Sequence, residues 1–140
     1  MAYFKIIEEG AFADYEFIAL GETKEALFAI CALATFEAMA DMSQIQPVDE
    51  IRFDITAEND TELLFAFLAE LIYLKDVEKI LLVQYDIKLS EDYKLSCIAR
   101  GEKIDQLKHD LKTDVKAVTY HHFELKQTPD GYSAHVILDL

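Results

Sequence analysis

Ile51-Arg52-Phe53-Asp54-Ile55-Thr56 alternates apolar and polar residues, and Asn59-Asp60-Thr61-Glu62 then opens a long apolar run. Alternation with a period of two predicts a half-buried strand over residues 50–57. Asn59 suits a helix N-cap, and Glu62 is placed to reach back to it. A strand followed directly by an amphipathic helix indicates an α+β domain. The apolar positions that recur at helical spacing are Leu64, Phe67, Leu68, Leu71 and Ile72.

Two main helices are predicted. The helix that Asn59 opens is expected to end at about Leu74, with Lys75 facing solvent. The other helix begins after Thr23, a typical N-cap residue, and runs to about Met39. It is apolar on nearly all sides, so we expect a sheet to cover one of its faces and other elements to cover the opposite one.

The other strands are predicted to pair mainly through short turns, because Thr128-Pro129-Asp130-Gly131 and residues 90–92 are turn signals. The predicted order is ββαβα followed by ββββ. We expect an antiparallel or mixed sheet with the helices packed on it, in a single domain that spans residues 1–140. The further strands are predicted at residues 3–7, 15–20, 80–89, 93–100, 114–125 and 132–139.

The charge of the chain limits its partners. The 140 residues are 52% hydrophobic, and 27 acidic against 13 basic residues give a formal net charge of -14. Such acidity argues against direct binding to nucleic acid or to anionic lipid, both of which attract Lys and Arg. It fits a basic protein partner or a bound cation, or it serves solubility alone.

A reducing compartment, the cytoplasm, is predicted. Cys31 lies in an apolar run and Cys97 in an alternating stretch, so both are expected to be buried thiols and not disulfide or zinc ligands. The N-terminus shows no signal-peptide pattern. The longest apolar stretch, residues 26–40, is shorter than the ~20 residues that a membrane span needs.

Three charged residues interrupt apolar strand patterns. Strand alternation places Lys116 on one face with Val118 and Tyr120, which predicts either a lysine at a strand edge or a functional one. Asp14 is either a turn acid or a ligand, and Asp139 closes an apolar strand, where burial would require a partner or a cation.

These acids suggest a cation site. If Leu140 ends the chain, its carboxylate joins Asp139 and Asp14 in an all-oxygen set suited to Ca²⁺ or Mg²⁺. His121 and His122 are adjacent in the predicted strand and should point to opposite faces, so they cannot both enter one small site without a bulge. A phosphate-binding glycine loop, a nucleophile elbow and a zinc-spaced histidine pair are all missing from the sequence, which disfavours an enzyme.

The stretch from Lys112 to His121, KTDVKAVTYH, resembles the most recognisable motif of the archease family. Ala13-Asp14 falls where archeases carry a His-Thr-Ala-Asp segment, and the ending Val136-Ile137-Leu138-Asp139-Leu140 also fits. Further similar segments in the same order are residues 21–28, 36–41 and 63–74.

This resemblance implies a function. Archeases assist the GTP-dependent RNA ligase RtcB in tRNA splicing and RNA repair, by promoting guanylylation of the ligase's active-site histidine and multiple turnover. The archease itself is then not an enzyme. The resemblance also implies a metal site at Asp14 and Asp139, with Lys116 and His121 as candidate partner-contacting residues.

The sequence departs from the family pattern beside that metal site. Ala11 and Phe12 replace the usual His and Thr, and Glu16 replaces a usual Gly. These changes leave other functions open: a chaperone or modulator of an RNA-modifying methyltransferase, a metal-dependent hydrolase, or a diverged paralogue that has lost metal binding.

Overall fold

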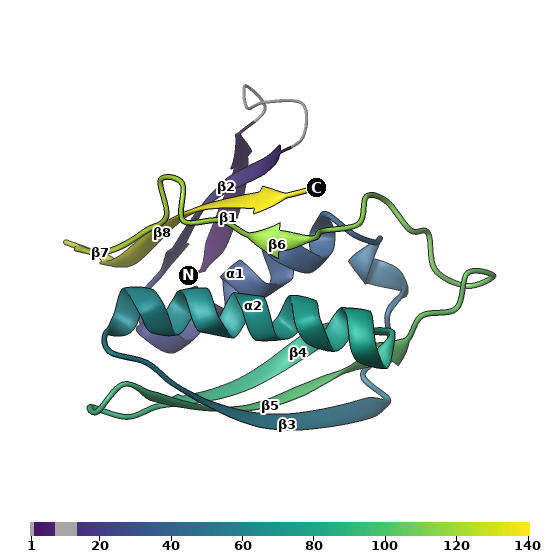
Figure 1. Cartoon of the computed structure of the whole chain (residues 1–140), viewed down its shortest axis with the longest axis horizontal. Coiled ribbons are helices and arrows are strands. Elements are labelled where there is room, and N and C mark those ends of the chain that lie inside the picture. The colour runs from purple at the N-terminus through teal and green to yellow at the C-terminus, as the bar shows by residue number, and fades with distance from the viewer. Residues whose placement is uncertain (1, 8–13) are drawn as a thin grey trace.

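The computed structural model describes residues 2–7 and 14–140. Its elements stack in three layers, with both α-helices between an upper and a lower sheet (Figure 1). The described elements are β1 (Tyr3–Ile7), β2 (Asp14–Gly21), α1 (Lys24–Glu37), the 3₁₀ helix η1 (Met42–Gln44), β3 (Asp49–Thr56), α2 (Asp60–Glu78), β4 (Ile80–Leu89), β5 (Lys94–Lys103), β6 (Ala117–Val118), β7 (Glu124–Thr128) and β8 (Gly131–Asp139). The α+β class and the two main helices are therefore confirmed.

The described strands pair antiparallel throughout and form two sheets where the sequence predicted one. In the lower sheet the order is β3-β5-β4, and in the upper sheet it is β1-β2-β8, with β6 and β7 both paired to β8. Residues 79–140 contain five strands and not the predicted four, because the strand expected over residues 114–125 is interrupted. A turn closed by the Phe123 amide donating to the Tyr120 carbonyl separates β6 from β7.

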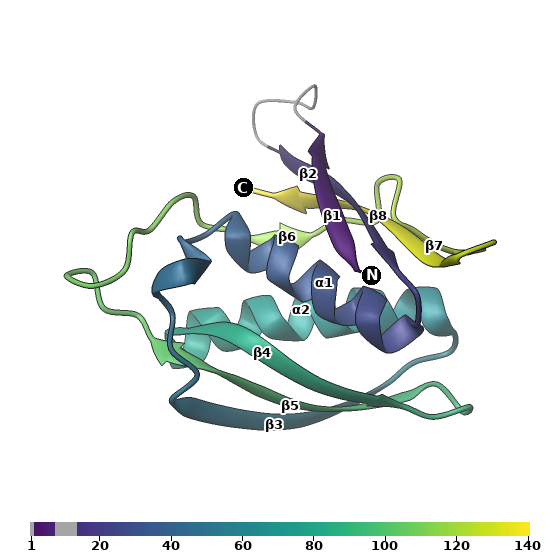
Figure 2. The same cartoon turned by 180° about the vertical axis from the view of Figure 1, so that it is seen from behind.

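Helix α1 fills the middle of the molecule, between β4 below and β2 and β8 above (Figure 2). Thr23 caps it as predicted, its hydroxyl accepting from the Ala26 amide at 3.0 Å. The Cys31 side chain is fully buried, and Thr35 is buried as well because its hydroxyl donates to the Cys31 carbonyl at 2.9 Å. A helix covered on both faces needs the all-round apolar surface that its sequence has.

Helix α2 is one turn longer than predicted. Asn59 caps it by accepting from the Glu62 amide at 2.9 Å, but the Glu62 carboxylate instead accepts from the Tyr120 hydroxyl at 3.0 Å. The helix continues to Glu78, and the prediction that Lys75 faces solvent is wrong, since this residue is 5% exposed. Its apolar stem packs inside while its ammonium finds carboxylates at the surface.

Aromatic rings join the two helices to the lower sheet. Phe67 of α2 is fully buried, with its ring centroid 5.8 Å from that of Phe28 in α1 and 6.1 Å from that of Phe53 in β3. Full burial of one such side chain contributes about 1.5–3 kcal/mol. Among the described residues, neither helix has the length and apolar character to cross a membrane.

Candidate functional site

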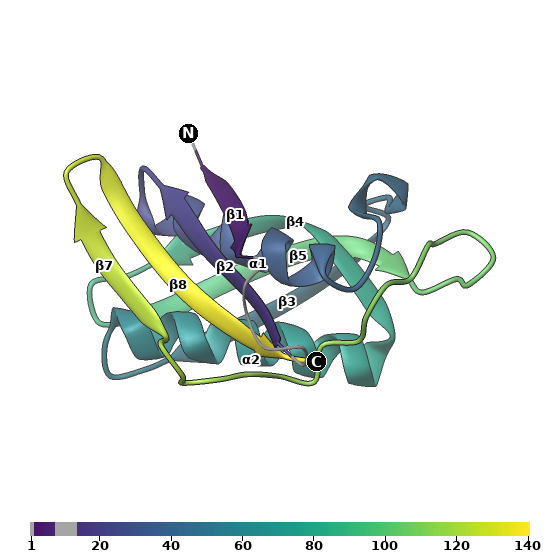
Figure 3. The same cartoon turned by 90° about the horizontal axis from the view of Figure 1, so that it is seen from above.

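The pairing of β2 with β8 places Asp14 directly opposite Asp139. Side chains of directly opposed residues in an antiparallel pair leave the sheet on the same face, with Cβ atoms about 4.5–5.5 Å apart. On the other side of β8, Ala117 of β6 is also opposite Asp139, and the Lys116 amide donates to the Asp139 carbonyl at 2.8 Å. Figure 3 shows the C-terminal end of β8 beside the start of β2. The three charged residues singled out in the sequence thus converge at one end of the upper sheet.

Strand alternation explains why these acids avoid the core. Leu138 is fully buried, so its neighbour Asp139 faces the opposite side of the sheet. Tyr15, opposite Leu138, packs toward the core, where burial, together with the Glu37 carboxylate, raises its pKa to about 12. Asp14 and Asp139 are both half-buried, which leaves their carboxylates accessible from one side.

Lys116 is exposed and sits directly before β6. Its position is fixed from the preceding residues, because the buried Lys75 ammonium donates to the Val115 carbonyl at 3.2 Å and to the Asp114 carboxylate, and pairs with Asp76 at 2.5 Å. Burial lowers the pKa of Lys75, but the two carboxylates raise it more, so the net shift is upward. We call the contacts of Lys75 with Asp76, Asp114 and the Val115 carbonyl the clamp. The clamp holds the segment that carries Lys116.

Glu16 lies on the same face as Asp14, two residues along β2. Its carboxylate oxygen is 2.5 Å from Nε2 of His135, which stands diagonally across on β8. Glu16 is thus held by a neighbouring imidazole. The departures at Ala11 and Phe12 lie outside the described residues.

The prediction that His121 and His122 point to opposite faces of a strand is wrong. Both lie in the turn between β6 and β7, where His122 adopts a positive φ of 55°. Their ring centroids are 4.1 Å apart, and the His122 ring is nearly parallel to that of His135 at 6.1 Å. The interrupted strand thus places His121 with a group of imidazoles, not on the paired strand beside Lys116.

The acid pair supplies only part of a cation shell. Within residues 2–7 and 14–140, no group of three or more His, Cys, Asp or Glu side chains is arranged to hold a metal ion. Asp14 and Asp139 are two carboxylates, and Leu140, half-buried, follows directly. Ca²⁺ takes six to eight oxygens, whereas Mg²⁺ is commonly bound by one or two carboxylates with waters and phosphates. The two carboxylates alone thus supply fewer oxygens than the full coordination shell of either ion.

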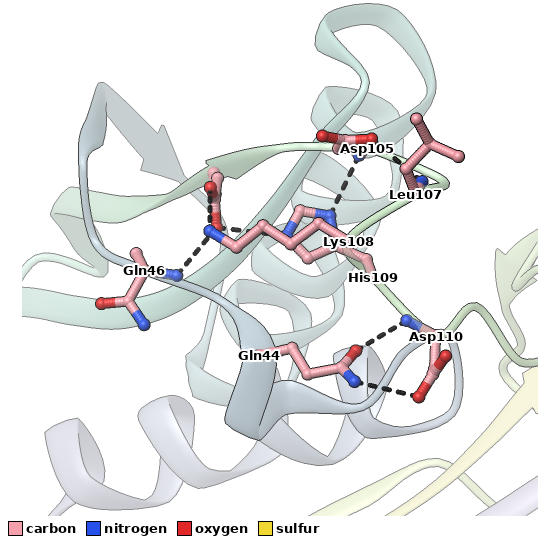
Figure 4. Close-up of polar contacts among 8 residues, drawn as sticks. Gln44, Gln46, Asp105, Leu107, Lys108, His109 and Asp110 are labelled. Atoms are coloured by element: carbon pink, nitrogen blue, oxygen red, sulfur yellow. Dashed lines mark hydrogen bonds and ion pairs between the residues drawn. The ribbon is translucent and has the colours of Figure 1, made fainter.

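An ordered loop precedes Lys116, and sequence reasoning did not find it (Figure 4). The His109 side chain is buried; its Nδ1 accepts from the Asp105 amide at 3.0 Å, so Nε2 carries the proton toward Glu102 at 3.1 Å. Hydrogen bonds from Lys108, the Gln46 amide and His109 lower the pKa of Glu102 to about 2. A single histidine among Lys and Asp residues was the one available signal.

The loop is also bonded to η1 through Asp110. The Gln44 side chain accepts from the Asp110 amide at 2.6 Å and donates to the Asp110 carboxylate at 2.9 Å (Figure 4). These bonds fix the start of the path that leads to Lys116.

The sequence also matches known proteins. A sequence model of the archease protein family matches residues 4–140. The chain belongs to the archease family. Among curated relatives, the protein archease of Pyrococcus furiosus is 35% identical, covering 91% of this chain and 93% of the relative. That of Methanothermobacter thermautotrophicus is 38% identical with the same coverage.

Solved archease-like structures share the fold. The solution structure of protein 1598 of Methanobacterium thermoautotrophicum superposes with a TM-score of 0.82 at 36% identity, covering 98% of each chain. A crystal structure from Thermotoga maritima, described as an archease and possible chaperone, gives a TM-score of 0.63 at 21% identity, covering 97% of this chain and 96% of the other. The archease resemblance seen in the motif around Lys116 is thus confirmed along nearly the whole chain.

Proposed function

We propose that this archease family member is a non-catalytic activator of a GTP-dependent RNA ligase of the RtcB type, acting in tRNA splicing or RNA repair. One observation carries the proposal: the β2–β8 register places Asp14 opposite Asp139, and Lys116 adjoins the same position through β6. These are the positions to which the family resemblance assigns function.

The site offers charge in place of reactive groups. Lys116 is exposed and directly precedes β6, and its amide donates to the Asp139 carbonyl on the neighbouring strand, so this end of the sheet carries both signs of charge. The two thiols are poor nucleophiles, because burial raises the pKa of Cys97 to about 12 and that of Cys31 still further. We infer that Lys116 contacts a phosphate or an acid of the ligase, and that the chain promotes guanylylation by positioning groups there.

A divalent cation, Mg²⁺ or Ca²⁺, is part of this proposal. Asp14 and Asp139 would hold it, together with the carboxylate of Leu140 where that residue ends the chain. Oxygens of the ligase or of its nucleotide would complete the shell, in the manner of Mg²⁺ sites that combine few carboxylates with phosphates. Such an ion supplies positive charge for phosphate oxygens. The net charge of -14 favours approach to a basic protein surface.

The test is the rate at which the ligase from the same source becomes guanylylated by labelled GTP. Asp139→Asn removes the charge but preserves the shape, and we expect it to abolish the stimulation seen with wild type. Asp130→Asn is the matched control, since this exposed acid lies in the turn at the opposite end of β8. Equal stimulation by the two variants would show that the acid pair is not the working site.

A second candidate is a chaperone or modulator of an RNA-modifying methyltransferase. The exposed apolar side chains of Tyr73 and Val77 on α2 favour it, because such surface suits transient contact with unfolded or partner chains. It predicts that the protein suppresses aggregation of the methyltransferase equally well with Asp139→Asn. A loss of suppression in that variant would contradict this reading.

A further inference from the structure

A partly apolar groove lies between α2 and β6, two elements that run side by side in Figure 1. It encloses about 270 Å³. Phe65, Ala69 and Tyr73, spaced one helical turn apart, form the side contributed by α2, and Val118 lines the opposite side. Apart from Lys116, the residues that line the groove have no part in the activator role proposed above.

Phe65, which lines the groove, is packed against two other aromatic rings in this structure. The Tyr120 ring stacks on Phe65 with centroids 3.8 Å apart and planes 5° from parallel. Phe123 meets Phe65 edge-on at 5.2 Å, and the Tyr120 hydroxyl donates to Glu62 at 3.0 Å. Tyr120 is nevertheless 61% exposed. Ordering an aromatic side chain before association reduces the entropic cost of binding.

Large side chains on α2 are left uncovered along the same line. Tyr73 is 57% exposed and Val77, one turn further, is 55% exposed. Tyrosine is among the residue types enriched at protein–protein contacts, where it often dominates the binding energy. The apolar surface thus extends from the groove along the outer side of α2.

Acidic residues outnumber basic ones around this surface, although the exposed Lys116 also lines the groove. Asp76 lines one end of the groove, and the Glu62 carboxylate that holds Tyr120 lies at the start of α2. The helix contains one lysine, Lys75, whose ammonium is buried against carboxylates. An apolar groove with an acidic surround on a chain of net charge -14 suits a segment that carries apolar anchors flanked by Lys or Arg.

We propose that this groove docks a basic, amphipathic segment of the partner protein, and so supplies affinity while the acid pair supplies activation. The inference rests on the proposed function, because Lys116 and Ala117 line the groove while Ala117 also stands opposite Asp139. A segment seated between α2 and β6 therefore brings its protein to the acid pair. Binding and activation are assigned to adjoining but separable residues.

The experiment is a calorimetric titration of the full chain with the RNA ligase from the same source, run beside the guanylylation assay. Ala69→Arg fills the groove with a bulky cation, and Tyr73→Ala removes an exposed ring. We expect the dissociation constant to rise about tenfold or more for the first and severalfold for the second. Tyr3→Ala is the matched control, since Tyr3 is 52% exposed on β1, away from α2. It should leave the dissociation constant within about twofold of wild type.

The two proposals fail in different ways. Asp139→Asn should bind as wild type does but fail to stimulate, whereas Ala69→Arg should stimulate once its concentration is raised to saturation.

Unchanged affinity in both groove variants, with melting curves like wild type, would overturn the docking site and leave the activator role standing. Binding without stimulation by wild type would overturn the activator role alone, and no binding would overturn both. A dimer of wild type that Ala69→Arg dissolves would assign the groove to a second copy and overturn the partner segment.

Discussion

Replacing Lys75 by Met tests whether the buried clamp holds the segment that presents Lys116. Methionine preserves most of the apolar stem but removes the ammonium, which donates to the Val115 carbonyl at 3.2 Å, donates to Asp114, and pairs with Asp76 at 2.5 Å. In the variant, both carboxylates regain water because their side chains are 53% and 68% exposed. The buried Val115 carbonyl loses a charged donor.

The expected loss of stability in Lys75→Met depends on which of the former partners of Lys75 regain water. Hydrogen bonds to charged groups contribute about 1.5–3 kcal/mol, and solvent screening of the exposed acids reduces their share. We therefore expect Lys75→Met to lower the free energy of unfolding by about 1–3 kcal/mol at neutral pH. At roughly 3 °C per kcal/mol for a domain of this size, the melting temperature falls by about 3–9 °C.

The assay is urea unfolding of both proteins across pH. The pKa of Lys75 is raised above its usual 10.5, so its stabilising effect is complete below that pH and is lost as pH rises through the folded pKa. The difference between wild type and Lys75→Met should thus be constant near neutrality and shrink above about pH 10.5.

The control for this experiment is Lys103→Met, whose ion pair with Glu78 spans 3.4 Å between side chains 58% and 48% exposed. We expect it to cost about 0.5 kcal/mol or less. A Lys75→Met protein as stable as wild type at neutral pH, or a difference that grows with pH, would refute the clamp.

Three further outcomes follow from the described contacts. The pKa of Glu102 is lowered from 4.5 to about 2, so its stabilising effect is present above about pH 4.5 and is lost on acidification. The stability advantage of wild type over Glu102→Gln, measured by urea unfolding, should therefore shrink as the pH falls from about 4.5 to about 2. Cys31 and Cys97 should resist a thiol reagent in the native state and both react in urea, whereas rapid native labelling would contradict their burial. Gly101→Ala should destabilise by about 3 kcal/mol in thermal melts, because the new Cβ would lie 1.8 Å from the Leu81 carbonyl oxygen; a near-neutral effect would show that the β4–β5 pairing yields easily.

Local patterns were enough to predict most elements. The alternation at residues 51–56 and the caps at Thr23 and Asn59 gave a strand and two helix starts that the structure confirms. The errors occur where a long-range contact overrides local chemistry. Local chemistry predicts Lys75 as a solvent-facing residue at the end of a helix, but ion pairs with the adjacent Asp76 and with Asp114, 39 residues away in sequence, allow it to be buried. His122, in the left-handed region, breaks a stretch that alternates like one strand.

Each residue of the candidate site could be singled out from the sequence, but their proximity in space could not be predicted. Asp14, Lys116 and Asp139 each departed from an apolar strand pattern, which local reasoning detects. Their meeting depends on the register of β2 and β6 against β8, and strand register between segments at opposite ends of a chain is not encoded in any local pattern. The groove beside α2 was missed for the same reason, since its walls come from separate parts of the sequence.

The most direct measurement is ligation by the RNA ligase of the same source, with the ligase limiting, counted as products per ligase molecule. The account predicts that the ligase stops near one product alone, continues through many with wild type, and stops again with Asp139→Ala or Lys116→Ala. A ligase that stays near one product with wild type, or that turns over equally well with folded Asp139→Ala, would contradict the claim that the acid pair at the end of β8 activates it.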